Sequence, residues 1–153
     1  MSTFTLTEAY VRSILEPGVE KPGDLSYKAF LPDGPFMKSL DPNLRWVITD
    51  VDGECIPGVK AEGVFNLAEW EKKVRDPLIA CLATPIGLRV NAVHIAGNVA
   101  IAETAGGATQ KNGQPYDNKY CWFLFFSPEG KIVEIHEYLN TALLERVYAG
   151  NRA

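Results

Sequence analysis

The sequence contains few cysteines and histidines, and both shortages exclude classes of protein. Cys55, Cys81 and Cys121 are far apart and form no CxxC pair, which fits reduced core thiols better than a disulfide framework or a zinc site. The histidines, His94 and His136, are too distant in the chain for a metal-binding motif such as HxxxH. We therefore expect no metal cofactor.

Positive charge is also scarce. Lys and Arg number 15 against 19 Asp and Glu, the net charge is −4, and the basic residues are scattered. Binding to nucleic acid needs clustered Lys and Arg, so no nucleic-acid partner is expected. The glycines form neither a GxGxxG motif nor a phosphate-binding loop, and no GxSxG motif occurs, so the sequence predicts neither a nucleotide cofactor nor a serine hydrolase.

Long hydrophobic runs are missing as well. The apolar stretches are shorter than a bilayer span, and the N-terminus has no basic or apolar region typical of a signal peptide. We expect a cytoplasmic protein without a membrane partner. The 153 residues, 46% hydrophobic and 22% charged, predict a single domain over 1–153 that buries its own core.

Capping residues and prolines divide the chain into elements. Thr5–Glu8 has the spacing of a capping box and predicts a first helix that ends before Pro17. Asn66–Glu69 predicts a second helix start, which Pro77 ends or bends, and Asn140 is expected to cap a final helix.

Strand-forming residues fill much of the remainder. The predicted strands are 44–50, 88–96, 99–104, 120–126 and 131–139, with a short helix inside the proline-rich segment 18–42. This order predicts an α+β fold with an antiparallel run of strands. Asp50–Glu54 begins like a calcium loop but lacks the remaining ligands, so we interpret it as a solvated turn.

A β-hairpin is predicted where two apolar strands flank Ser127–Gly130. A tight turn sets Phe126 opposite Lys131, and this register sets Tyr120 opposite Glu137. Because strand side chains alternate, one face then carries Tyr120, Trp122, Leu124, Val133, Ile135 and Glu137. The pattern thus predicts a carboxyl group on a mostly apolar wall.

Such a carboxyl group has the properties of a general acid or base. Desolvation raises the pKa of a carboxyl group toward the range in which it exchanges protons near neutrality. The opposing Tyr120 can donate a hydrogen bond to Glu137 or to a substrate oxygen. The alternation also fits a Glu137 that faces solvent on an edge strand, and the pattern alone leaves both interpretations open.

The other hairpin face is largely apolar too. It carries Cys121, Phe123, Phe125, Ile132, Glu134 and His136, which places His136 away from Glu137. One face must cover the interior and the other must be covered by something else. We therefore expect a homodimer built on Phe123 and Phe125.

Two segments resemble a known superfamily. GQPYDNKYCW (113–122) and GKIVEIHEYLNTAL (130–143) resemble SnoaL-like proteins of the NTF2-like, or ketosteroid-isomerase-like, superfamily. The resemblance implies a cone in which three to four helices wrap a curved mixed or antiparallel sheet around a cavity. Members include isomerases, polyketide cyclases, epoxide hydrolases, dehydratases and non-catalytic binding modules. The Arg-x-Asp pair of limonene-epoxide-hydrolase-like members is absent around 103–106, which disfavours epoxide hydrolysis.

The resemblance also implies site residues. Glu137, which precedes Tyr138, matches the position of the catalytic carboxylate in cyclases of this group. The chain looks most like fungal secondary-metabolism isomerases of the semipinacolase type, in which an arginine of the first strand and two tyrosines spaced four apart accompany a late glutamate. Arg45, Tyr116, Tyr120 and Glu137 match that set.

These residues lead to one prediction with stated alternatives. We expect a cofactor-independent isomerase or cyclase that acts on an apolar polycyclic natural product, with a pocket walled by Trp46, Trp122, Leu124 and Ile135. Arg45 also fits a surface position on its strand, and Tyr116 also fits a turn before its strand. A non-catalytic NTF2-like ligand-binding or dimerisation module remains the alternative, and a hollow cone would favour the enzyme.

Overall fold

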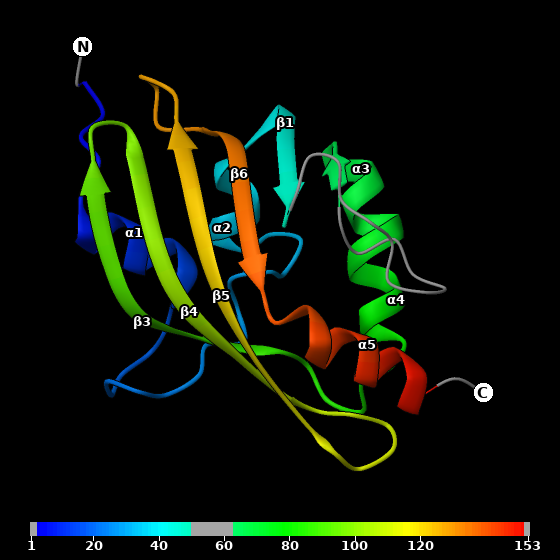
Figure 1. Ribbon diagram of the computed structural model, residues 1–153. Coiled ribbons are helices and arrows are strands. Elements are labelled where there is room, and N and C mark those ends of the chain that lie inside the picture. The colour runs from blue at the N-terminus through cyan, green and yellow to red at the C-terminus, as the bar shows by residue number, and fades with distance from the viewer. Residues whose placement is uncertain (1–2, 50–62, 152–153) are drawn as a thin grey trace.

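A curved six-stranded sheet forms the body of the protein, with strand order β2-β1-β6-β5-β4-β3 (Figure 1). The computed structural model describes residues 3–49 and 63–151. The strands are β1 (Leu40–Ile48), β2 (Gly63–Phe65), β3 (Gly87–Ala96), β4 (Val99–Thr109), β5 (Pro115–Phe126) and β6 (Ile132–Leu139). The α+β class and the mixed, curved sheet of an NTF2-like cone are confirmed.

The sheet is antiparallel except at one pair. β1 and β6 run parallel, whereas β1–β2, β3–β4, β4–β5 and β5–β6 pair antiparallel. The parallel pair sets Trp46 beside Ile135 and Ile48 beside Glu137. The expected turn at Asp52-Gly53, the stretch Asp50–Glu54 and Cys55 lie outside the described residues.

The helices close one side and one end of the sheet (Figure 1). They are α1 (Glu8–Leu15), α2 (Pro35–Ser39), α3 (Leu67–Trp70), the π-helical turn η1 (Glu71–Arg75), α4 (Asp76–Ile79) and α5 (Thr141–Gly150). α1 and α2 lie behind the strands in this view, α3 and α4 stand beside β1, and α5 crosses the end of β6. Within the parts of the chain that the structure describes, no helix has both the length and the apolar character needed to cross a bilayer.

The observed helix caps are those predicted from the sequence, except at the first helix. Asn66 and Glu69 form both hydrogen bonds of a capping box, and the Asn140 side chain accepts from the N–H of Leu143. The first helix is capped by Thr7, which accepts from the N–H of Tyr10 at 3.1 Å, so the predicted Thr5 capping box is wrong. Caps satisfy N–H groups that the first helical turn leaves without partners.

The helical segment that starts after Asn66 continues past Pro77 instead of ending there. The helix continues through α3, η1 and α4, and the π-helical turn η1 lies immediately before Asp76–Ile79. A proline cannot donate to the carbonyl four residues earlier, and its ring crowds that carbonyl. A widened turn before Pro77 accommodates this conflict and keeps the helix along the sheet.

The hairpin forms, but its register differs from the prediction by two residues. Trp122 lies opposite Glu137, and Tyr120 lies opposite Leu139. A shift of two preserves the alternation, so the predicted common face of Trp122 and Glu137 is confirmed. A bulge near the turn pairs Phe126 with Ile132. Ile132 is therefore buried in the core instead of lying on the outer face, and Val133 does not share the inner face as predicted.

β4 and β5 are longer than predicted, reaching Thr109 and starting at Pro115. Residues 116–118, for which a turn was an open alternative, lie within β5. The added pairs bring the glycines at 106 and 107 opposite Asn118 and Asp117. This extension places Tyr116 and Tyr120 on one continuous strand.

The main core lies between the inner face of the sheet and α1 and α2. Its fully buried members include Val11, Leu15, Phe36, Leu124 and Ile135. A second cluster packs α5 against β5 through residues such as Tyr116, Leu144, Val147 and Tyr148. The gap in side-chain packing between these two clusters is where the pocket lies.

Candidate active site

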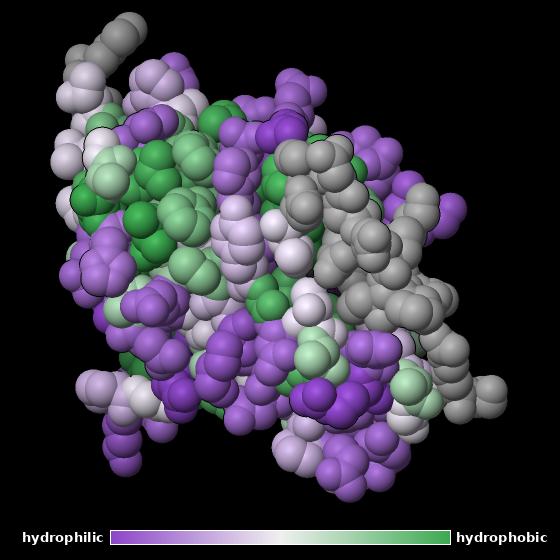
Figure 2. Space-filling model, viewed as in Figure 1, coloured by the Kyte–Doolittle hydropathy of each residue, from purple (hydrophilic) through white to green (hydrophobic). Residues whose placement is uncertain are grey.

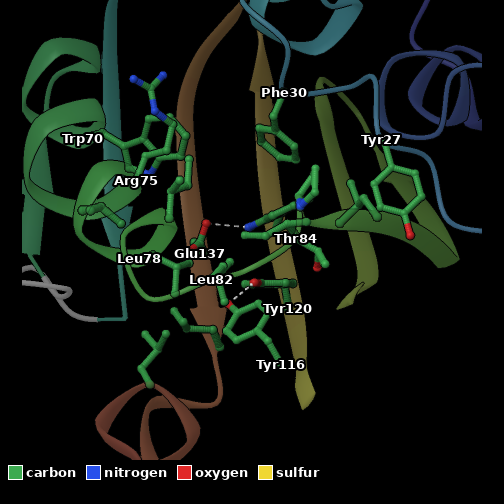
Figure 3. Close-up of a pocket in the computed structure, with 18 of the residues that line it drawn as sticks. Tyr27, Phe30, Trp70, Arg75, Leu78, Leu82, Thr84, Tyr116, Tyr120 and Glu137 are labelled. Atoms are coloured by element: carbon green, nitrogen blue, oxygen red, sulfur yellow. Dashed lines mark hydrogen bonds between the residues drawn. The ribbon is translucent and has the colours of Figure 1, made fainter. Parts of the chain in front are cut away.

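A cavity of about 490 Å³ opens between the inner sheet face, the helical segment α3 to α4, and α5. Its walls are mainly apolar or aromatic, and Figure 3 shows Glu137, Tyr116 and Tyr120 directed into the same space. β5 supplies Tyr116, Tyr120 and Trp122, and β6 supplies Glu137. The cone is therefore hollow, and it combines a carboxyl group with two phenols in apolar surroundings.

Glu137 is the acidic group of this cavity. Its side chain is 6% exposed, and Oε1 accepts a hydrogen bond from Trp122 Nε1 at 2.7 Å. Burial raises the pKa of Glu137 to about 7, against the opposing effects of the Trp122 and Trp46 indoles. The solvent-facing alternative is therefore wrong, and the hydrogen-bond partner is the opposing tryptophan instead of Tyr120. Near neutral pH this carboxyl group can both accept and release a proton.

Two tryptophans complete the wall beside Glu137. Trp46 on β1 stacks on Trp70 of α3, with ring centroids 4.2 Å apart and planes 8° apart. Trp46 Nε1 is buried and has no hydrogen-bond partner among the described residues. Burial has the largest effect on the pKa of Glu137 and raises it. Trp122 lowers this pKa, and the nearby Trp46 lowers it by a smaller amount. The expectation that Trp46 and Trp122 form pocket walls agrees with their positions, and Trp70 lines the pocket as well.

Tyr116 and Tyr120 form a pair at the other end of the cavity. Their hydroxyl oxygens are 2.5 Å apart, and Asn118 Nδ2 donates to the Tyr116 hydroxyl at 3.2 Å. Burial raises the pKa of Tyr116 to about 12, and burial also raises the pKa of Tyr120 well above its ordinary value. Both phenols are therefore protonated at neutral pH and act as hydrogen-bond donors rather than bases.

A glycine makes room for Tyr120. A Cβ atom on Gly106 would lie 3.0 Å from Tyr120 Cε2 and 3.2 Å from its hydroxyl oxygen. The ring also stacks on Trp122, with centroids 5.2 Å apart. The glycine and the tryptophan thus fix the direction of the phenol, which is what a positioned donor requires.

Arg45 does not face the cavity. It is exposed on the outer side of β1 and pairs with Glu134. Its neighbour Trp46 faces inward, and adjacent strand residues point to opposite faces. The prediction that Arg45 is directed into the pocket is therefore wrong, and the surface alternative describes its position.

Two predicted wall residues also lie elsewhere. Leu124 and Ile135 are 0% exposed and belong to the main core, and neither lines the cavity. His136 lies on the outer face with its Nε2 3.5 Å from Glu134, and His94 lies near Glu103. Neither histidine lines the cavity. No group of three or more His, Cys, Asp or Glu within residues 3–49 and 63–151 is arranged to hold a metal ion.

Several lining residues were not predicted. They include Tyr27 and Phe30 before α2, Arg75 and Leu78 along the helical segment, and Tyr148 of α5. Arg75 lies 6.0 Å from the Trp70 ring centroid and pairs with Glu71 and Asp76. The spacing of Trp70, Val74 and Leu78 is a helical signal that could have indicated this wall.

The outer face of the sheet carries the second apolar surface (Figure 2). Hydrophobic residues gather over β3 to β5 in this view. Phe123 and Phe125 on β5 lie there, and their rings contact Tyr138 and His136. Both phenylalanines are half-buried in the chain. Their location on the face opposite the cavity agrees with the predicted alternation.

No protein-family model matches the sequence, and no curated protein matches it. Solved structures with the same fold do match. An NTF2-like protein of unknown function from Burkholderia pseudomallei K96243 is 19% identical with a TM-score of 0.65, over 92% of this chain and 95% of the other. A candidate SnoaL-like polyketide cyclase from Jannaschia sp. CCS1 is 10% identical with a TM-score of 0.64, over 94% and 92%.

A fungal structure matches as well. The BvnE pinacolase from Penicillium brevicompactum is 15% identical with a TM-score of 0.60, over 81% of this chain and 84% of the other. These identities establish the fold, and the resemblance inferred from the sequence is confirmed at that level. The chain has the NTF2-like, SnoaL-like fold.

Proposed function

We propose that this protein is a cofactor-independent isomerase or cyclase that moves a proton within an apolar small molecule. The observation that carries the proposal is the Glu137 carboxyl group, buried in a hollow apolar pocket with its pKa raised to about 7. A solvated glutamate is a weak base, and its conjugate acid is scarce at neutral pH. Burial makes both protonation states available to one residue.

In the first candidate reaction, Glu137 removes a proton from the substrate and returns it to the same molecule. Ionised Glu137 removes a proton from a carbon that lies between a carbonyl and a C=C bond, and the C–H electron pair becomes a new C=C bond of a conjugated enolate, a dienolate. The enolate oxygen, which takes the developing charge, accepts a hydrogen bond from Tyr120. Glu137 then returns the proton to the far end of the dienolate, where a C=C electron pair forms the new C–H bond and the C=O bond re-forms. The C=C bond has moved into conjugation with the carbonyl, so the product is an isomer and no oxidant or reductant is consumed.

A semipinacol rearrangement uses the same two groups. Glu137 takes the proton of a hydroxyl, and the C=O bond forms as a carbon group migrates to the adjacent epoxide carbon and breaks its C–O bond. The released oxygen accepts a hydrogen bond from Tyr120 and then receives the proton that Glu137 had taken. The shared fold with a pinacolase supports this reaction type. The apolar and aromatic walls of the pocket support an apolar substrate, and we propose a polycyclic natural product from secondary metabolism. The outward direction of Arg45 removes one member of the expected residue set, leaving Tyr116, Tyr120 and Glu137.

The outer apolar face supports a homodimer. Phe123 and Phe125 lie on the sheet face opposite the pocket, so a second copy can cover them without closing the cavity. The lining residues described above all come from one chain.

The test is proton exchange on a panel of bicyclic and tricyclic ketones in D₂O. Binding is first measured by quenching of the pocket tryptophans, and exchange of the C–H next to the carbonyl is then followed by NMR. We expect exchange with the natural chain and a loss of about 10²- to 10⁴-fold with Glu137→Gln. Glu134→Gln is the matched control, because Glu134 lies on the same strand but faces outward. Ketones that bind but exchange no faster than with Glu137→Gln would identify a non-catalytic binding module.

A further inference from the structure

Asn118 is a fully buried polar side chain beside the pocket, and its contacts fix the identity of its two terminal atoms. It is 0% exposed, and its Oδ1 accepts from the backbone N–H groups of Lys119 at 2.8 Å and Asn140 at 3.1 Å. A backbone N–H can only donate, so the atom facing both must be the oxygen. The atom facing Tyr116 is therefore the amide nitrogen, which can only donate.

This assignment sets the direction of the hydrogen bond between the two tyrosines. By distance alone either hydroxyl can be the donor. If Tyr120 donated, the Tyr116 oxygen would accept twice, and its own proton would be buried with no acceptor among the described residues. A buried unpaired donor is costly, so Tyr116 donates to Tyr120. Both tyrosines line the cavity, but Tyr116 is 1% exposed whereas Tyr120 is half-buried, so a free proton on Tyr120 can reach the cavity and one on Tyr116 cannot.

We propose that Asn118 is a positioning residue that orders the chain Asn118 to Tyr116 to Tyr120, so that Tyr120 presents a proton to a ligand oxygen. The proposal rests on the proposed function only in that the pocket must bind a small molecule. It also names the ligand class, which has an apolar body and an oxygen that accepts hydrogen bonds, as in a ketone, an epoxide or an ether. The hydrogen bond that Tyr120 receives strengthens the one it gives.

Asn118→Asp tests the direction with little change in size. One oxygen of the new carboxylate keeps both backbone N–H groups, and the other now accepts where an amide had donated. Tyr116 then donates to this oxygen and accepts from Tyr120, which withdraws the Tyr120 proton from the cavity. Three donors, from Lys119, Asn140 and Tyr116, stabilise the ionised form of the new carboxyl group.

The binding experiment compares α-tetralone with tetralin, which has the same ring system without the oxygen. At pH 8.5, Asn118→Asp should lose affinity for the ketone by about 2- to 12-fold, as Tyr120→Phe does, while tetralin affinity stays unchanged. In acid the new carboxyl group is protonated, can donate to Tyr116 again, and should restore the ketone preference. Glu137 also titrates in this range and acts on both phenols, so the natural chain is measured in parallel.

A second measurement needs neither a ligand nor the Asp variant. In the natural chain, NMR with ring-labelled tyrosine should show one slowly exchanging hydroxyl proton in this pair, and its couplings to the labelled ring should assign it to Tyr116. A protected proton on Tyr120 instead of Tyr116 overturns the proposal. So does an Asn118→Asp chain that keeps the ketone preference at pH 8.5, or one that loses both ligands equally. Absence of binding by both ligands to the natural chain would contradict the proposed function, while the hydroxyl measurement would still decide the direction.

Discussion

Glu137→Gln should change the pH dependence of stability as well as catalysis. The glutamine keeps the size of the side chain and an oxygen that can accept from Trp122 Nε1, a hydrogen bond of 2.7 Å in the natural chain. It removes the group whose charge the pocket disfavours. The variant therefore isolates the free-energy cost of holding a carboxylate in this cavity.

The structure gives the size and sign of this cost. Burial raises the pKa of Glu137 from an ordinary 4.5 to about 7. Each pKa unit corresponds to about 1.4 kcal/mol, so ionisation costs the folded state about 3 kcal/mol relative to the unfolded chain. The folded state binds this proton more tightly, so the associated stability is fully present below about pH 4.5 and is lost as the pH rises through about 7.

The assay is urea unfolding followed by tryptophan fluorescence between pH 4 and pH 8. Relative to Glu137→Gln, the natural chain should lose about 3 kcal/mol of unfolding free energy across this range. Glu134→Gln is the control of opposite sign. Burial acts to raise the pKa of Glu134, but Arg45 and His136 outweigh burial, and the pKa is lowered. The contribution of Glu134 to the stability of the folded protein therefore increases as the pH rises.

Parallel stability curves for the natural chain and Glu137→Gln, within about 0.5 kcal/mol at every pH, would refute this reasoning. Such a result would mean that water or a relaxed cavity solvates the carboxylate. A general base with a pKa near neutrality would then have no physical basis in this pocket.

Three further predictions concern neighbouring residues. Trp122→Phe removes the hydrogen-bond donor to Glu137 and should therefore raise the pKa of that carboxyl group above 7. A ¹³C NMR titration measures this pKa, and an unchanged value would contradict the assigned hydrogen bond. Arg45→Ala should leave ketone exchange within about twofold of the natural rate, because Arg45 pairs with Glu134 outside the cavity; a loss as large as that of Glu137→Gln would return Arg45 to the site. Phe123→Glu should convert a homodimer into a monomer in light scattering, whereas a natural chain that is already a monomer would contradict the proposed dimer.

The hairpin pattern correctly predicted that Glu137 shares a face with Trp122, although the register was wrong. The actual pairing differs by two residues, and an even shift keeps every side chain on its face. The prediction failed at Ile132 because the bulge near the turn adds one residue and changes the parity locally. Turn residues alone do not reveal such a bulge.

Arg45 shows an error that the sequence could have prevented. Arg45 and Trp46 are neighbours in one strand, so they cannot both face the cavity. Tyr116 and Tyr120 show the opposite case. Side chains four apart in a strand share a face, but their Cα atoms are about 13 Å apart at ~3.3 Å per residue. Their hydroxyl groups meet at 2.5 Å because the two side chains lean toward each other (Figure 3), and this lean is not readable from residue types.

The outward direction of Arg45 helps to explain the properties of Glu137. A cation beside a buried carboxylate favours its ionised form and lowers its pKa, which would weaken it as a base. Arg45 is engaged with Glu134 on the other side of the sheet, and Arg75 at the pocket wall is engaged with Glu71 and Asp76. Glu137 receives one hydrogen bond from an uncharged indole instead. Because burial is then opposed only by uncharged donors, its pKa stays near 7, where the carboxylate is both basic and populated.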